Sequence, residues 1–334
     1  MTAEGTINEL QQEVETLKRQ LHQAQCNNGL LPTPDTLSPP IQTGKQPLDH
    51  LKHAQDNRDI TTVLSPEKPS FPPSLSITHP LLLLADSALP LGSFAYSSGL
   101  ESYLAHTKTQ PTHTGSHPSS VESFYKFLAL SISSLASTTL PYVLKAHKFP
   151  SLLEDLDNDM DASTPCTVAR RASVAQGLAL LGVWERAYKT SYQRPASADS
   201  KAGSNATAAV EALDAFSSAL KDDPADAYLG CPANGHLAPL WGVVCVAMGV
   251  DIKQAGYVFM LNHAKAVLSA AVRASVMGPY QAQAVLASQG LQDMIVQRSR
   301  DHWETDPDDA GQNVPVIDLW VGRHELLYSR IFNS

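Results

Sequence analysis

Cysteine is scarce in this sequence, and basic residues do not predominate. Among its 334 residues are only four cysteines, and no two of them form a Cys-x-x-Cys pair; they are Cys26, Cys166, Cys231 and Cys245. This spacing argues against a zinc knuckle and predicts a reduced chain in the cytoplasm. The formal net charge of −9 predicts no nucleic-acid partner, because such binders carry a basic stripe.

Long hydrophobic runs are missing as well. No run approaches the ~20 apolar residues that a membrane-spanning helix needs. The first ten residues, MTAEGTINEL, lack the basic flank and apolar core of a secretory signal. We therefore expect a soluble cytoplasmic protein with no membrane partner.

The common catalytic and cofactor motifs do not occur either. There is no GxxxxGK[ST] phosphate loop, HExxH motif or EF-hand loop. Ser97 and Ser98 lie in YSSG, which lacks the first glycine and the preceding strand of a nucleophile elbow. We expect no enzyme activity, no cofactor and no bound metal. A metal site from His106, His113 and His117 is the alternative to a solvated loop, but Gly115 and flanking prolines oppose the helix that would align them.

Composition divides the chain into three regions. Residues 1–25 carry a 3-4-3-4 apolar spacing, typical of a short coiled-coil-like helix, at Ile7, Leu10, Val14, Leu17 and Leu21. Residues 26–78 are rich in proline and polar residues, which predicts a disordered linker. Residues 79–334 form the main domain, with polar insertions at 107–120 and 194–206.

The sequence predicts that the main domain is all-α. Its apolar residues recur at helical spacing from residue 79 to about residue 300, and strand patterns are nearly missing. We predict a bundle of roughly eight to ten helices, preceded by the disordered N-terminal extension. Residues 79–104 carry the strongest local pattern, which predicts a helix, an apolar turn and a second helix. Ser98 and Glu101 predict a capping box for the second helix, and Tyr96 lies in the turn.

An alanine-rich segment follows the helix cap predicted at Asp251. Small side chains allow close helix approach, so we expect a central position or a contact between two copies, involving Ala270, Ala271 and Arg273. His263 in this segment is either a hydrogen-bonded core histidine or, less favoured, a functional one.

The last residues, 316–334, are unusually apolar for a C-terminal tail and contain interleaved arginines. Tails are normally loose unless they dock. One alternative is docking on the chain's own bundle. The other is ordering on a partner, with Arg330 pairing a carboxylate or carbonyl there. The candidate partner-binding residues are Tyr96, Glu101, Arg323, His324, Tyr328, Arg330 and Phe332.

Several stretches, in the same order, resemble the UreF family of urease accessory proteins. The stretch LLLLADSALPLGSFAYSSGLES at 81–102 is similar to the family signature. Three more resemble it at 169–181, 235–250 and 257–283, and the tail PVIDLWVGRHELLYSRIFNS is similar to the family's C-terminal ending. The first 78 residues and the polar insertions resemble longer eukaryotic, fungal-type forms.

This resemblance implies a function in assembling the nickel enzyme urease. Family members are all-α dimers that bind the accessory protein UreD, also called UreH, and the pair then recruits the GTPase UreG to apo-urease. We therefore expect a non-enzymatic scaffold and a homodimer. The alternative is a nickel-binding chaperone, or a regulator of the GTPase, without a stable scaffold role.

Overall fold

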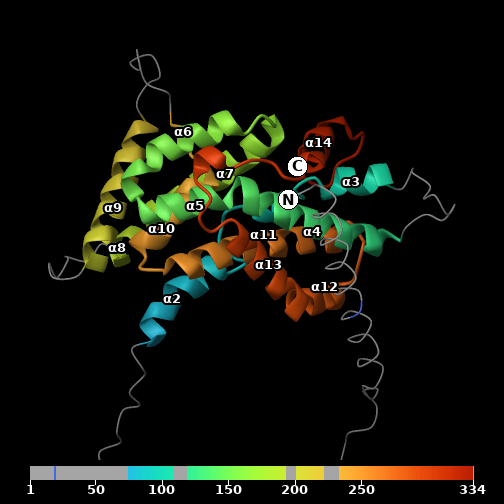
Figure 1. Ribbon diagram of the computed structural model, residues 1–334, viewed down its shortest axis with the longest axis horizontal. Coiled ribbons are helices and arrows are strands. Elements are labelled where there is room, and N and C mark those ends of the chain that lie inside the picture. Colours follow the sequence, from blue (N-terminus) through green and yellow to red (C-terminus); the bar gives the residue numbers. More distant parts are fainter. Residues whose placement is uncertain (1–18, 20–73, 108–118, 193–200, 222–232, 334) are drawn as a thin grey trace, which may run out of the picture.

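The computed structural model describes Arg19 and residues 74–107, 119–192, 201–221 and 233–333 (Figure 1). Apart from Arg19, the predicted coiled-coil helix lies outside these residues, as does nearly all of the predicted linker. The helix α2 begins at Ser74, so the helical domain starts a few residues before the expected boundary at residue 79.

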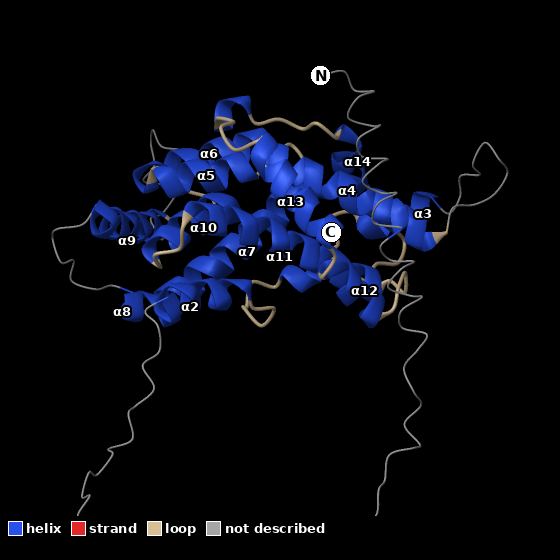
Figure 2. Cartoon of the chain, turned by 60° about the horizontal axis from the view of Figure 1, so that its bottom comes forward, coloured by secondary structure: helices blue, strands red, loops and turns tan. Residues whose placement is uncertain are grey.

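The predicted all-α class is confirmed: the described ranges contain helices and no strand (Figure 2). The helices are α2 Ser74–Ala85, α3 Leu100–Thr107, α4 Ser120–Thr138, α5 Leu140–Lys148, α6 Leu153–Ser163, α7 Thr167–Val183, α8 Lys189–Tyr192, α9 Lys201–Ala219, α10 Leu237–Ala247, α11 Ile252–Arg273, α12 Pro279–Leu286, α13 Gln289–Asp301 and α14 Pro315–Arg323. Short 3-10 turns lie at Ser93–Ala95, Pro150–Leu152, Pro307–Asp309 and His324–Leu326, and a π-helical turn at Trp184–Tyr188 joins α7 to α8.

Helix α10 lies at the centre of the bundle. Every residue from Ala238 to Ala247 is buried, as expected for a helix that is apolar on all sides. It packs against α5, α7, α9 and α11. The helices of the core therefore converge on one hydrophobic segment.

Two glycines allow this close packing. A Cβ atom on Gly177 of α7 would overlap Gly235 O, just before α10. A Cβ on Gly242 of α10 would likewise overlap Val143 O of α5. Both approaches bring backbone against backbone, where no side chain could move aside.

Helix ends follow local sequence signals at several places. Helix α4 ends at Thr138, and Pro141 lies in the first turn of α5, where its missing N–H group costs no helical hydrogen bond. Asp251 caps α11 as predicted, since its side chain accepts a hydrogen bond from Lys253 N at 2.9 Å. Helices α12 and α13 are separate, because Ser288 caps α13 by accepting a hydrogen bond from Leu291 N.

The stretch Ser120–Lys148 is long and apolar enough to cross a membrane by length and composition. However, 78% of its most apolar window is buried inside the bundle. Its hydrophobicity is explained by core packing, since a central helix of a globular domain has the same composition.

We predict that Gly177→Ala lowers the free energy of unfolding by about 1–3 kcal/mol, because overpacking forces α7 away from the start of α10. Urea denaturation followed by circular dichroism measures this. Gly278→Ala is the control: a Cβ there meets no atom within 4 Å, so its stability should match that of the parent. Equal stability of all three proteins would contradict the packing described here.

Candidate functional site

The C-terminal tail is docked on the turn that precedes α3. Asn333 N donates to Ala95 O at 2.8 Å. Ile331 N and Phe332 N donate to the two carboxylate oxygens of Glu101, at 2.8 and 3.3 Å. The Phe332 side chain is only 4% exposed. Of the two alternatives for the tail, the structure supports docking on the chain's own bundle.

His324 fixes the other end of this tail segment. Its side chain is fully buried, and Nε2 lies 2.9 Å from Phe332 O. Because a carbonyl oxygen only accepts, Nε2 carries the proton. Residues 324–332 therefore form a closed loop, held internally by His324 and externally by Glu101.

The predicted capping box at Ser98 is wrong. Ser98 has a positive φ of 53°, and Glu101 N donates instead to Ser97 Oγ at 3.4 Å. The Glu101 carboxylate therefore does not cap the helix, and it accepts from the N–H groups of Ile331 and Phe332. Its position in the first turn of α3 also suits a negative charge. Gly99, two residues before Glu101, allows α14 to approach, since a Cβ there would lie 2.9 Å from Val321 N.

Arg273, at the end of α11, joins the turn to the tail. Its guanidinium donates to Phe94 O and lies over the Phe332 ring, 4.4 Å from the ring centroid. It was expected at a contact between copies, together with Ala270 and Ala271. Both alanines are completely buried inside the single chain, so their small side chains serve packing within the bundle.

Outside this docked core, the same segments expose large apolar side chains. We call this region the tail–turn surface; it comprises Phe94, Tyr96, Arg323, Leu326, Tyr328, Arg330 and Ile331. Phe94 is 66% exposed and Leu326 81% exposed. Tyr328 and Ile331 are also exposed, whereas Tyr96 is half-buried. Glu101, His324 and Phe332 lie beneath and hold the surface in place.

Charge on the tail–turn surface is arranged around Glu325. Its carboxylate pairs with Arg171 of α7, and with Arg330 of the tail at 3.1 Å. These two guanidinium groups hold the pKa of Glu325 below its usual value. Arg323, two residues before Glu325 in the chain, is exposed. The surface thus combines aromatic and aliphatic side chains with arginine, a composition typical of protein-binding hot spots.

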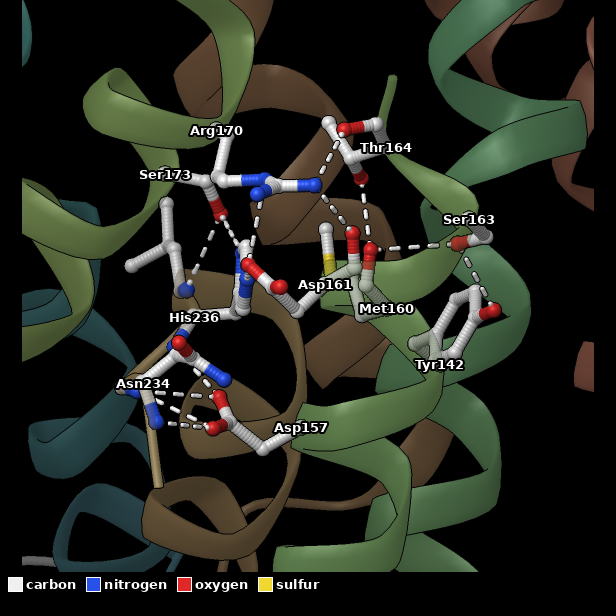
Figure 3. Close-up of polar contacts among 12 residues, drawn as sticks. Tyr142, Asp157, Met160, Asp161, Ser163, Thr164, Arg170, Ser173, Asn234 and His236 are labelled. Carbon is white, nitrogen blue, oxygen red and sulfur yellow. Dashed lines mark hydrogen bonds and ion pairs between the residues drawn. The ribbon is translucent and has the colours of Figure 1, made fainter. Parts of the chain in front are cut away.

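A second polar cluster lies at the N-terminus of α10 (Figure 3). Asp157 of α6 is fully buried, and its carboxylate accepts from the backbone N–H groups of Asn234, Gly235 and His236 at 2.6, 3.1 and 2.6 Å. His236 is the N-cap of α10, and Asn234 and Gly235 lie directly before it, so the carboxylate holds the backbone that leads into the helix. Asp157 belongs to the acidic run 154–161, yet it is buried. Its spacing of four and three residues from the buried apolar residues Leu153 and Met160 places it on the core-facing side of α6.

His236 continues the cluster. Its Nδ1 lies 3.1 Å from Ser173 Oγ of α7, and its Nε2 lies 3.2 Å from Asp161 Oδ1 of α6. Arg170 also pairs with Asp161, Nε to Oδ1 at 3.1 Å. A serine, a histidine and an aspartate also compose hydrolytic triads. Here, however, Ser173 lies within α7 and its Oγ accepts from Leu237 N at 3.3 Å, so the three residues fasten α6, α7 and α10 together.

A pocket of about 500 Å³ lies beneath the turn. Residues of the turn, α4, α7, α11 and α14 line it. His263 in its wall bonds to Ser131 Oγ at 2.8 Å, and burial lowers the pKa of His263 to about 4. This agrees with the hydrogen-bonded core histidine that we favoured.

The metal-ligating side chains are scattered. Among the residues that the structure describes, no group of three or more His, Cys, Asp or Glu side chains could hold a metal ion. His106 Nδ1 lies 2.6 Å from Ser102 O, whereas His113 and His117 lie outside the described ranges. Cys245 is buried, which raises the pKa of its thiol.

Comparison with known proteins agrees with the motifs. The family model described as UreF matches residues 119–289. An "uncharacterized urease accessory protein UreF-like" from Schizosaccharomyces pombe is 34% identical over 257 residues, covering 77% of this chain and 97% of the relative. "Urease accessory protein 6" of Cryptococcus neoformans is 28% identical, covering 79% and 99%. "Urease accessory protein F" of Arabidopsis thaliana is 26% identical, covering 75% and 90%.

These relatives associate the chain with urease maturation. The chain belongs to the UreF family.

We predict that Asp157→Asn lowers the free energy of unfolding by about 1–3 kcal/mol, because at least one buried N–H group loses its acceptor. Chemical denaturation measures the change. Asp159→Asn, on the exposed side of the same helix, should change it by less than about 0.5 kcal/mol. Similar losses in both variants would show that overall charge, and not the cap of α10, is responsible.

We also predict that Glu101→Gln loosens the tail. An amide keeps only one acceptor oxygen, so one of the Ile331 and Phe332 N–H groups loses its partner. Hydrogen exchange with mass spectrometry should show faster exchange in residues 327–333, with the core helices unchanged. Glu154→Gln, at an exposed site on α6, is the control. Unchanged protection of the tail in Glu101→Gln would contradict the contact's importance.

Proposed function

We propose that this protein is a non-enzymatic scaffold for urease maturation. In this proposal it acts with UreD/UreH and recruits the GTPase UreG, so that nickel can be inserted into apo-urease. Membership of the UreF family supports a place in this process. The proposal also places the protein in the cytoplasm as a homodimer, with a contact between copies that does not involve Ala270 and Ala271.

The observation that carries the proposal is the tail–turn surface. Its apolar side chains are exposed although the backbone beneath them is held by five contacts: those from Asn333, Ile331 and Phe332, and those of His324 and Arg273. An ordered surface loses less conformational entropy when it binds than a loose tail does. The exposed Leu326 and Tyr328 can therefore act as prepared anchors for a protein partner.

The arginines of the tail–turn surface indicate which charge the partner surface should carry. Arg330 uses one nitrogen for Glu325, and a guanidinium has five N–H donors, so several remain for a second acceptor. Arg323 adds a further exposed guanidinium. An acidic partner surface with a hydrophobic centre complements this arrangement, since charge-assisted bonds to arginine are strong and directional.

We expect Arg330→Ala to weaken the complex with UreD/UreH and UreG at least about tenfold, as hot-spot truncations do. Co-expression followed by gel filtration measures co-elution, and circular dichroism checks that the variant is folded. Arg300→Ala, at an exposed site on α13, is the matched control. Tyr328→Ala should weaken the complex in the same way.

Two results would oppose the proposal. Independent elution of the three parent proteins at micromolar concentration would remove the scaffold function. Full co-elution of both Arg330→Ala and Tyr328→Ala would retain a scaffold but exclude the tail–turn surface as its binding site.

A further inference from the structure

The imidazole of His324 has one nitrogen atom that the docked tail leaves without a hydrogen bond. Its Nε2 carries a proton and donates to Phe332 O at 2.9 Å. Its Nδ1 is buried and has no hydrogen-bond partner among the described residues. When the ring is neutral, Nδ1 is therefore a buried acceptor without a donor. Such atoms are unfavourable and rare, so this one requires an explanation.

A carboxylate lies close to this nitrogen. Glu101 Oε2 is 3.8 Å from His324 Nδ1, the side chain of His324 is fully buried, and that of Glu101 is only 14% exposed. The same carboxylate accepts from Ile331 N and Phe332 N. Neither Nδ1 of the neutral ring nor the carboxylate can donate, so the two repel each other. A proton on Nδ1 converts this repulsion into an attraction between opposite charges.

Other ionisable side chains surround the docked tail. They are Glu101 and Tyr103 of α3, Cys166 directly before α7, Arg171 of α7, Arg273 of α11, Asp318 and Arg323 of α14, and Glu325 and Arg330 of the tail. Glu325 is paired with arginines, whereas Arg273 lies over the Phe332 ring. Burial and the charge of Arg273 oppose a charged imidazole, and Glu101 favours it. The effect of Glu101 prevails because its carboxylate faces Nδ1 directly, in a site shielded from water.

We propose that the docked tail takes up a proton at His324 Nδ1, so that the tail–turn surface is ordered in slightly acidic solution and loosens as the pH rises. In the docked tail, the proton lies between the buried imidazole and Glu101. In a released tail, His324 is in water, away from this carboxylate, and binds the proton less tightly. Release of the tail therefore releases a proton, and a higher pH favours it. This property belongs to the tail itself and does not depend on any partner.

Hydrogen exchange with mass spectrometry on the full chain tests the proposal, with each rate divided by the intrinsic rate at that pH. The range is about pH 5.5 to 8, where histidine changes its charge and carboxylates in water do not. We expect the protection of residues 327–333 to fall at least about tenfold across this range, which corresponds to one unit of differential proton binding. The protection of α10 should stay constant.

Variants identify the group that takes up the proton. His324→Gln keeps an N–H donor for Phe332 O but cannot take up a second proton, so the protection of its tail should not depend on pH. Glu101→Gln removes the charge that favours the proton and should lose most of the dependence. His79→Gln, at an exposed site on α2, is the matched control and should behave like the parent.

Nitrogen-15 NMR of the parent gives a second test that needs no variant. The His324 ring, assigned by its NOE to Phe332, should carry protons on both nitrogens at about pH 6 and only on Nε2 at about pH 8. Three results would overturn the proposal. They are an Nδ1 without a proton at pH 6, tail protection in the parent that is independent of pH, as a buried water donating to Nδ1 would produce, and a docked His324→Gln tail that keeps the dependence.

Discussion

A helix that is apolar on every side must be enclosed along its length and satisfied at its ends, and α10 is such a helix. Its sides are covered by α5, α7, α9 and α11. The Asp157 carboxylate accepts from the backbone N–H groups of Asn234 and His236, directly before the helix, and Ser173 Oγ accepts from Leu237 N, the first N–H group of the helix. The positive end of the helix dipole favours the negative charge there.

This constraint fixes the neighbouring helices as well. Asp157 and Asp161 both lie on α6. The hydrogen bonds that Asp157 accepts from residues 234–236 and the contact of Asp161 with His236 therefore hold α6 against the start of α10. Ser173 and Gly177 lie one turn apart on α7; the first bonds to His236 and the second allows the backbones to touch. The polar cluster therefore sets the relative positions of α6, α7 and α10, which the hydrophobic effect alone leaves free because it has no direction.

The tail–turn surface uses a carboxylate in the same way. Glu101 accepts two backbone N–H groups from a segment distant in sequence, as Asp157 accepts those before α10. In each case, one acidic side chain in a helix accepts hydrogen bonds from backbone N–H groups outside the regular helices. The difference is exposure: Asp157 is inaccessible and stabilises the core, whereas Glu101 lies at the edge and supports exposed anchors above it.

Much of the fold could be predicted from local sequence. The cap at Asp251 and the break near Thr138 depend on residues within a few positions, and apolar periodicity sufficed for the all-α class. Glu101 was assigned to a capping box with Ser98 because its spacing from that residue matches one, and this assignment is wrong. Its real partners are 230 and 231 positions away. The function of Asp157 was missed for a related reason. The sequence around a carboxylate in an acidic run does not indicate that it accepts hydrogen bonds from the backbone N–H groups of residues 234–236.

The contact between Glu101 and Ile331 also has a consequence for synthesis. After Glu101 is made, the ribosome must add another 230 residues before its partner exists, which takes roughly tens of seconds at ordinary elongation rates. During that time α3 and the turn can form, but the surface that they share with the tail cannot. A chain interrupted before the tail therefore lacks this surface, whatever the state of its core, and only molecules that include residues 324–333 can present it.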